Sequence, residues 1–164
     1  MGKFKPLSEL RRTIAAEKAR GKTIVLANGC FDLFHVGHIR YLRAARAKGD
    51  VLVVAINSDS SVRKLKGKGR PILPQRERAE ILAAFSFVDY VTAFSEPTVT
   101  RVLLALRPDV HVKGSDYSRD TVPEKDTVKS YGGRVAIVGG PKIRDTSQVI
   151  RDIAAGMSKE IRKG

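Results

Sequence analysis

Residues 23–38 read Thr23-Ile-Val-Leu-Ala-Asn-Gly-Cys-Phe-Asp-Leu-Phe-His-Val-Gly-His38, and this stretch decides the fold. Its first six residues are a short apolar run rich in β-branched side chains, which predicts a buried strand. Apolar residues then recur at helical spacing up to Gly49, so a helix follows the strand. At the carboxyl end of a parallel strand, the following helix offers free N–H groups and its positive dipole end, and both favour an anion. We therefore expect a ligand site at this junction.

Two histidines, His35 and His38, lie at the junction with Gly37 between them. An imidazole N–H is a compact donor for a phosphate oxygen, and Gly37 allows a sharp turn and a close approach by phosphate. Asp32 is placed to help hold a magnesium ion or to orient a histidine. The alternative is that His35 and His38 are a helix cap and a surface group whose hydrogen bonds are satisfied. The paired spacing favours phosphate chemistry.

Gly29-Cys-Phe-Asp32 followed by His35-Val-Gly-His38 resembles the Gly-x-Phe-Asp-x-x-His-x-Gly-His motif of the nucleotidyltransferase superfamily. Within that superfamily, the chain resembles more closely the adenylyltransferase domain of ADP-heptose synthesis, which acts on D-glycero-β-D-manno-heptose 1-phosphate. The further segments that carry this resemblance are residues 57–59, 65–67, 70–71 and 112–117. The resemblance implies transfer of AMP from ATP to a sugar 1-phosphate with release of pyrophosphate, and it implies Mg²⁺ as cofactor.

The resemblance also implies roles for individual residues. His35, His38 and Lys66 are the expected catalytic groups. The expected nucleotide and phosphate contacts are Gly29, Phe31, Asp32, Gly37, Lys64, Arg78, Lys113, Asp116, Arg144, Thr146 and Ser147. The metal ion is expected mainly through the phosphates of the substrate, with Asp32 as the candidate protein ligand.

Residues 63–70 hold five basic residues, two glycines and no acid, which is typical of a mobile, solvated loop. At the ligand edge, lysines on such a loop are suited to close over a triphosphate. Arg78 follows in a helix predicted over residues 75–85, and arginine suits bidentate phosphate contact. The alternatives for Arg78 are an ion pair with the neighbouring Glu77 or Glu80 and simple solvation. Residues 57–59 either cap the next turn or, as the resemblance implies, form part of the site rim.

The last helix is predicted over residues 148–157, and the hydroxyls of Thr146 and Ser147 at its first turn suit phosphate. The superfamily has a run of hydroxyl residues here, often after an arginine, whereas this chain has Asp145 in the first hydroxyl position. We expect Asp145 to be the N-cap of the helix. His111, between two valines, is expected to be structural, and Cys30 is expected to be a small filler.

The 164 residues and a hydrophobic content of 42% predict one α/β domain over residues 1–164. Its doubly wound, Rossmann-like parallel sheet is expected to have about five strands. The predicted strands cover residues 23–28, 50–57, 87–93, 109–113 and 134–138. Helices are predicted over residues 7–20, 97–106 and 122–131, and a basic tail over 158–164.

The formal charge is +14, from 31 Lys and Arg against 17 Asp and Glu, which favours a polyanionic partner. A nucleoside triphosphate with a sugar phosphate fits this charge, and so does nucleic acid. Against a nucleic-acid-binding module, the chain has 6% aromatic residues, no tryptophan and no nucleic-acid-binding motif. A sister alternative keeps the reaction but uses CTP and glycerol 3-phosphate.

No apolar run is long enough to span a bilayer, and the N-terminus lacks a secretory core. A single cysteine excludes an internal disulfide and fits a reducing compartment, so we expect a cytoplasmic protein of bacterial type. A homodimer is compatible with the sequence. No sugar kinase domain is present, so a separate kinase is expected to supply the sugar phosphate.

Overall fold

The computed structural model describes residues 2–141 and 145–161, with side chains up to residue 156. Its strands are β1 (Ile24–Gly29), β2 (Val51–Asn57), β3 (Tyr90–Phe94), β4 (Val110–Lys113) and β5 (Arg134–Ile137). Its helices are α1 (Leu7–Ala19), α2 (Val36–Arg46), α3 (Asp59–Lys66), α4 (Gln75–Ala84), α5 (Thr100–Leu106), α6 (Lys125–Ser130) and α7 (Thr146–Ile161).

The five strands form one parallel sheet in the order β3-β2-β1-β4-β5. The central strand β1 pairs with β2 on one side, where Ile24 lies opposite Val51, and with β4 on the other, where Val25 lies opposite Val110. The direction of the strand order therefore reverses between β1 and β4, and ligands bind at such a switch point in open α/β sheets. The predicted doubly wound parallel sheet is confirmed.

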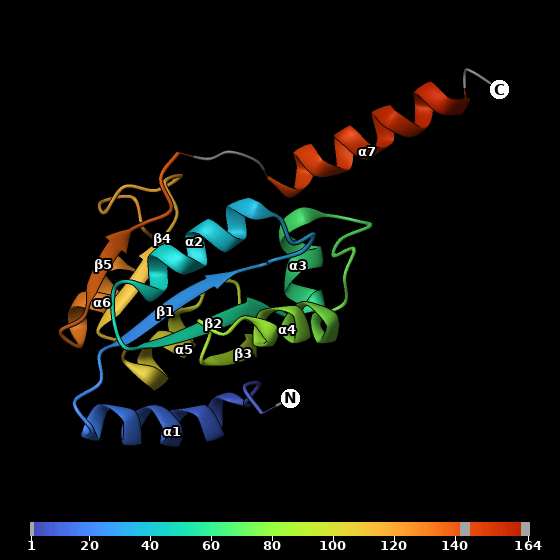
Figure 1. Cartoon of the computed structure of the whole chain (residues 1–164). Coiled ribbons are helices and arrows are strands. Elements are labelled where there is room, and N and C mark those ends of the chain that lie inside the picture. The colour runs from blue at the N-terminus through green and yellow to red at the C-terminus, as the bar shows by residue number, and fades with distance from the viewer. Residues whose placement is uncertain (1, 142–144, 162–164) are drawn as a thin grey trace.

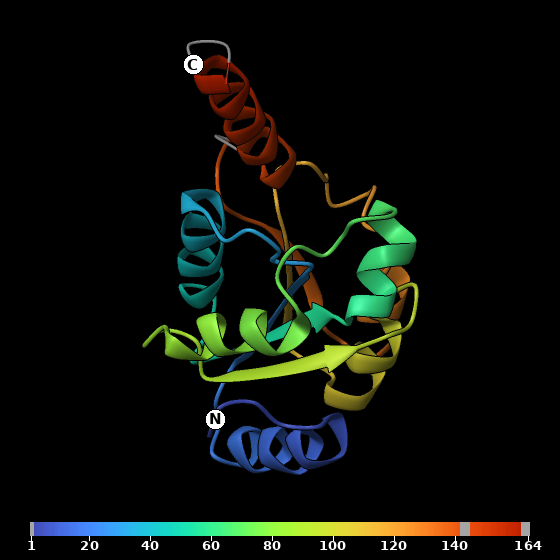
Figure 2. The same ribbon diagram turned by 90° about the vertical axis from the view of Figure 1, so that its right-hand side faces the viewer.

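Helices cover both faces of the sheet, because successive side chains of a strand point to opposite faces. Val25 and Ala27 of β1 belong to the cluster of buried residues that includes α2 and α4. Ile24 and Leu26 belong to the cluster that includes α1, α5 and α6. Figures 1 and 2 show α1 covering one face of the sheet and α2 lying over the other.

Helix α7 is placed differently from the other helices. Figures 1 and 2 show it extending away from the sheet, with only its first turn near the main body of the domain. Ile153 on this helix is 54% exposed. None of the helices in the described ranges combines the length and the apolar character needed to cross a bilayer.

The basic segment 63–70 differs from the predicted loop, because its first half is helical. Helix α3 continues to Lys66, and Gly67 then ends it with a positive φ of 92°. The side chain of Ser58 accepts a hydrogen bond from the amide of Ser61, and Val62 on the inner face of α3 is buried. These cap and core contacts outweigh the solvated character of the basic run.

Candidate active site

A cavity of about 470 Å³ opens at the carboxyl edge of the sheet, over the switch point between β1 and β4. This volume falls in the range of small-molecule sites. Its walls come from the ends of β1 and β4, the first turns of α2 and α7, the end of α3 and the loops that follow β4 and β5. Of the predicted site residues, those lining it are Gly29, Phe31, Asp32, His35, Gly37, His38, Lys66, Lys113, Asp116, Thr146 and Ser147.

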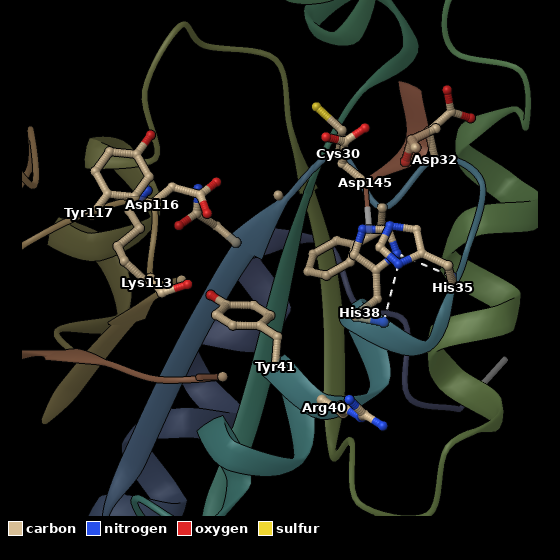
Figure 3. A pocket seen from close by; sticks show the side chains of 18 of the residues that line it. Cys30, Asp32, His35, His38, Arg40, Tyr41, Lys113, Asp116, Tyr117 and Asp145 are labelled. Atoms are coloured by element: carbon tan, nitrogen blue, oxygen red, sulfur yellow. Dashed lines mark hydrogen bonds between the residues drawn. The ribbon is translucent and has the colours of Figure 1, made fainter. Parts of the chain in front are cut away.

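The two histidines hold the start of α2 together. His35 is the N-cap, and its Nδ1 accepts the amide of Gly37 at 3.1 Å. The Nδ1 of His38 accepts the amide of His35 at 3.4 Å, which completes a reciprocal capping box. The rings are stacked with centroids 3.9 Å apart, and Figure 3 shows them side by side. His35 is therefore the helix cap that the alternative expected, whereas His38 is a partly buried partner in the same capping box and not a surface group. Both residues also line the cavity wall.

The capping bonds determine where each imidazole carries its proton. A ring nitrogen that accepts a hydrogen bond has no proton, so in the neutral ring the proton lies on Nε2. Burial, and after it the neighbouring His35, lower the pKa of His38 to about 3, against a smaller opposing effect of Asp32. His38 is thus a neutral Nε2–H donor at physiological pH. The caps commit both Nδ1 atoms to backbone amides, so each neutral ring can donate only through its Nε2.

The ring of Phe31 packs against the ring of His38. Its ring lies edge-on to that of His38, with centroids 5.2 Å apart, and the side chain is 4% exposed. Phe31 has a positive φ of 47°, which is strained for a bulky residue. A Cβ at Gly29 would lie 3.2 Å from the Phe31 ring, so the glycine makes room for it. The strained turn fixes the ring against which His38 packs.

Asp32 anchors the segment after α3 rather than facing a ligand. Its carboxylate accepts the amides of Ile72 and Leu73, each with a 2.9 Å bond, and Nε of Arg70 at 2.7 Å. Burial alone would raise the pKa of Asp32, but the bonds from Leu73, Ile72 and Arg70 outweigh it and lower the pKa. Since three donors already occupy these oxygens, the structure does not support Asp32 as a magnesium ligand. Among the described residues, no three His, Cys, Asp or Glu side chains form a metal cluster.

Arg78 is a structural residue, contrary to the predicted phosphate contact. Its side chain is buried beneath the site and does not line the cavity. Its guanidinium donates to the carbonyls of Cys30 at 2.6 Å, Asn57 at 2.8 Å and Leu73 at 3.0 Å, and it pairs with Asp59 at 2.7 Å. These bonds join the ends of β1 and β2 to the start of α3. The residues 57–59 likewise cap and brace this junction and do not line the cavity.

The cationic side chains on the α3 side of the cavity are Lys66 and Arg70. Lys66 is the last residue of α3 and is exposed at the cavity. Arg70 is held by Asp32 and lies mostly buried in the wall. Lys64 is exposed on α3 but does not line the cavity.

Lys113, Asp116 and Tyr117 form the opposite wall, at and after the end of β4 (Figure 3). Thr146 and Ser147 line the cavity at the first turn of α7, and Arg144 lies outside the described residues. The carboxylate of Asp145 accepts the amide of Gln148 at 2.7 Å. Asp145 is therefore the predicted N-cap, and its charge is directed to the helix start.

The floor of the cavity includes Asn28, whose Oδ1 lies 3.0 Å from Nε2 of His111. His111 is fully buried, and burial, together with a smaller effect of Lys113, lowers its pKa to about 3. His111 is thus the structural histidine that its valine neighbours predict. Cys30 also behaves as expected, because burial raises the pKa of its thiol and keeps it protonated.

Sequence reasoning assigned no role to several cavity residues, among them Asn28, Arg40, Tyr41, Arg70 and Tyr117. Tyr41 lies at helical spacing from the core residues of α2, and its hydroxyl donates to the carbonyl of Val112 at 2.9 Å. Arg70 had a detectable signal, since it precedes Pro71 within a segment that carries the family resemblance.

Comparison with known proteins places this geometry in a family. Residues 26–155 match the model of the family described as cytidylyltransferase-like. The chain is 50% identical over 151 residues to the bifunctional protein HldE of Syntrophotalea carbinolica. These aligned residues make up 92% of this chain and 31% of that protein. The chain is 51% identical over 158 residues to HldE of Geobacter metallireducens, covering 96% of this chain and 32% of that protein. The chain thus spans about a third of the length of these relatives.

Solved structures give the same picture. A lipopolysaccharide core biosynthesis protein from Thermoplasma volcanium has a TM-score of 0.64 and 29% identity, covering 76% of this chain and all of that one. A pantoate-β-alanine ligase from Francisella tularensis, solved with a β-γ ATP ligand and β-alanine, has a TM-score of 0.60. At 16% identity over 88% of this chain and 68% of that one, the ligase shows the shared fold alone. With its family match over most of the sequence and its paired histidines at the sheet's switch point, the chain belongs to the cytidylyltransferase-like family of nucleotidyltransferases.

Proposed function

We propose that this domain transfers AMP from ATP to a sugar 1-phosphate, specifically D-glycero-β-D-manno-heptose 1-phosphate, and releases pyrophosphate. The observation that carries the proposal is the pair of stacked imidazoles at the switch point of the sheet: each ring uses its Nδ1 to cap the start of α2, and both rings line the cavity. Identity of about 50% to the HldE proteins and the resemblance to the ADP-heptose adenylyltransferases support the choice of substrates.

The reaction needs no covalent intermediate. A phosphate oxygen of the sugar phosphate attacks the α-phosphorus of ATP, and the bond from that phosphorus to the bridging oxygen of the β-phosphate breaks. Pyrophosphate leaves with the bonding electron pair. A phosphate monoester is already ionised near neutral pH, so no general base has to remove a proton from it. Catalysis then depends on positioning and on stabilising the charge that develops.

The residues of the cavity supply these effects. His35 and His38 donate to the oxygens of the α-phosphate, and the N-terminus of α2 adds its dipole. Lys66 and Arg70 lie on one side of the histidines and bind the β- and γ-phosphates. The first turn of α7, with Thr146 and Ser147, provides a second helix terminus for phosphate.

Magnesium fits this site as an ion that arrives with the triphosphate. The described residues form no metal cluster, and Asp32 is saturated with donors. Mg²⁺ keeps several waters and binds readily through phosphate oxygens, where it neutralises their charge. The protein's own part is to hold the phosphates that carry the ion.

A pyrophosphate-release screen tests the proposal. ATP, CTP, GTP and UTP are each combined with heptose 1-phosphate or with glycerol 3-phosphate. We expect turnover with ATP and the heptose phosphate. Turnover with CTP and glycerol 3-phosphate alone would replace the substrates but keep the reaction, and the absence of pyrophosphate from every pair would refute it.

A further inference from the structure

A buried ion pair lies in the cavity wall opposite Lys66. Lys113 is the last residue of β4, and Glu124 is the residue before α6. Nζ of Lys113 lies 3.6 Å from Oε2 of Glu124, and their side chains are 10% and 6% exposed. Within the described part of the chain, this buried Glu124 oxygen has no donor at hydrogen-bond distance. The ammonium of Lys113 is thus the charge that compensates it.

The two partners differ in their access to the cavity. Lys113 lines the cavity and Glu124 does not. The Lys113 ammonium also lies 5.2 Å from the centre of the Tyr117 ring, within the range of a cation–π interaction. The carboxylate behind it and the ring beside it restrain the ammonium in the wall that an incoming ligand meets.

Burial makes the charge of Lys113 costly, since removing an ion from water costs several kcal/mol. Burial lowers the pKa of Lys113, and the opposite charge of Glu124 limits this lowering. An opposite charge within about 4–6 Å shifts a pKa by about 1–3 units. The carboxylate of Glu124 therefore opposes the loss of the Lys113 proton that burial favours.

The other titratable groups around Lys113 do not replace Glu124. His111 on the same strand is neutral, since its pKa is about 3. Tyr117 and Asp116 come from the loop after β4, Tyr41 from α2 and Asp145 from the start of α7. Asp145 is engaged as the cap of α7. Glu124 is the carboxylate that the structure pairs with Lys113.

We propose that Glu124 is a positioning residue of the active site, which holds the Lys113 ammonium charged and fixed so that it binds a phosphate oxygen of the substrate. This inference rests on the proposed function, because it takes the ligand of the cavity to be a phosphate. Glu124 itself touches no substrate and acts through Lys113.

The test compares Glu124→Gln with Asp126→Asn, a matched control that removes an exposed carboxylate from α6 nearby. The acetylation rate of Lys113 is measured against pH by mass spectrometry, without substrate. We expect Glu124→Gln to shift the Lys113 profile to lower pH by about one unit or more, and Asp126→Asn to leave it unchanged. An unchanged profile in folded Glu124→Gln would overturn the proposal.

Turnover provides the second readout. In Glu124→Gln the alkaline limb of kcat/KM shifts to lower pH with the Lys113 profile, whereas a merely structural loss lowers the rate equally at every pH. Glu124→Asp keeps the charge but moves it one methylene further from Lys113, so we expect a smaller shift of the Lys113 profile. This variant tests the proposal if Glu124→Gln does not fold. A wild-type protein without turnover would refute the proposed function, while the acetylation profile would still decide the role of Glu124.

Discussion

Replacing His38 with asparagine separates the two functions of its ring. The side-chain oxygen of asparagine occupies roughly the place of Nδ1, so it keeps the bond from the His35 amide that closes the capping box. It has nothing at the place of Nε2, so the donor to the phosphate is lost. Glutamine does the reverse, because its amide reaches the place of Nε2.

The magnitude follows from these bonds. Loss of one donor that stabilises developing charge costs about 10²–10³ in kcat, or about 2.7–4 kcal/mol. The retained cap limits the loss of folding stability, since a lost N-cap costs about 0.5–2 kcal/mol. We therefore expect His38→Asn to lower kcat by at least about 10²-fold at nearly unchanged thermal stability. We expect His38→Gln to recover part of that loss.

The assay is pyrophosphate release at saturating substrates, with a thermal melt of each variant. Inactivity of His38→Asn with a strongly lowered melting temperature would show a structural role alone. Wild-type turnover of folded His38→Asn would refute the assignment of His38 as a donor in the transition state. Because His38 is neutral down to a pKa of about 3, its protonation should cause no loss of activity between about pH 8 and 5.5.

Four further outcomes are expected. Arg78→Met leaves buried carbonyls without a hydrogen-bond donor, so we expect the free energy of unfolding, measured by urea denaturation, to fall by about 3 kcal/mol or more. The control Arg76→Met, on the exposed side of α4, should change it little. Asp32→Asn weakens the anchor of residues 70–73 and raises KM for the nucleoside triphosphate by about tenfold, and an unchanged KM would contradict that anchoring role. For His38 and His111 the folded pKa of about 3 lies below the unfolded value, so the unfolded state binds more protons as the pH falls below about 6.5. The free energy of unfolding should then fall by up to about 1.4 kcal/mol per pH unit for each histidine between about pH 6.5 and 5, and His111→Gln should roughly halve that slope. Removal of magnesium with EDTA should abolish turnover but leave the melting temperature unchanged, since the described residues hold no metal cluster; a lowered melting temperature would reveal a structural ion.

The local pattern of the chain predicted the strand, the turn and the helix around His35 and His38. That part is predictable because the apolar run, the capping residues and the following helix are all neighbours in sequence. The order of the strands was not predicted, because it depends on pairings such as that of Val25 with Val110, which local patterns do not encode.

The errors at the site have the same physical origin. The carboxylate of Asp32 accepts hydrogen bonds from Ile72 and Leu73, about forty residues further along the chain. The motif around Asp32 therefore could not show that its oxygens are already occupied. Arg78 was assigned to phosphate because the family resemblance and the bidentate geometry of arginine favour that contact. In the structure its guanidinium is buried and donates to the carbonyls of Cys30 and Asn57. A residue type indicates which chemistry is available, and only the packing shows which partner takes it.

The most direct test of the account is nuclear magnetic resonance of isotope-labelled histidine, with and without magnesium and a non-hydrolysable ATP analogue. At neutral pH we expect His38 to be uncharged, both rings to accept a hydrogen bond at Nδ1 and carry a proton on Nε2, and their Nε2–H signals to shift when the analogue binds. Rings protonated on Nδ1, or Nε2–H signals that do not move while the analogue binds elsewhere on the protein, would contradict the claim that this pair holds the α-phosphate.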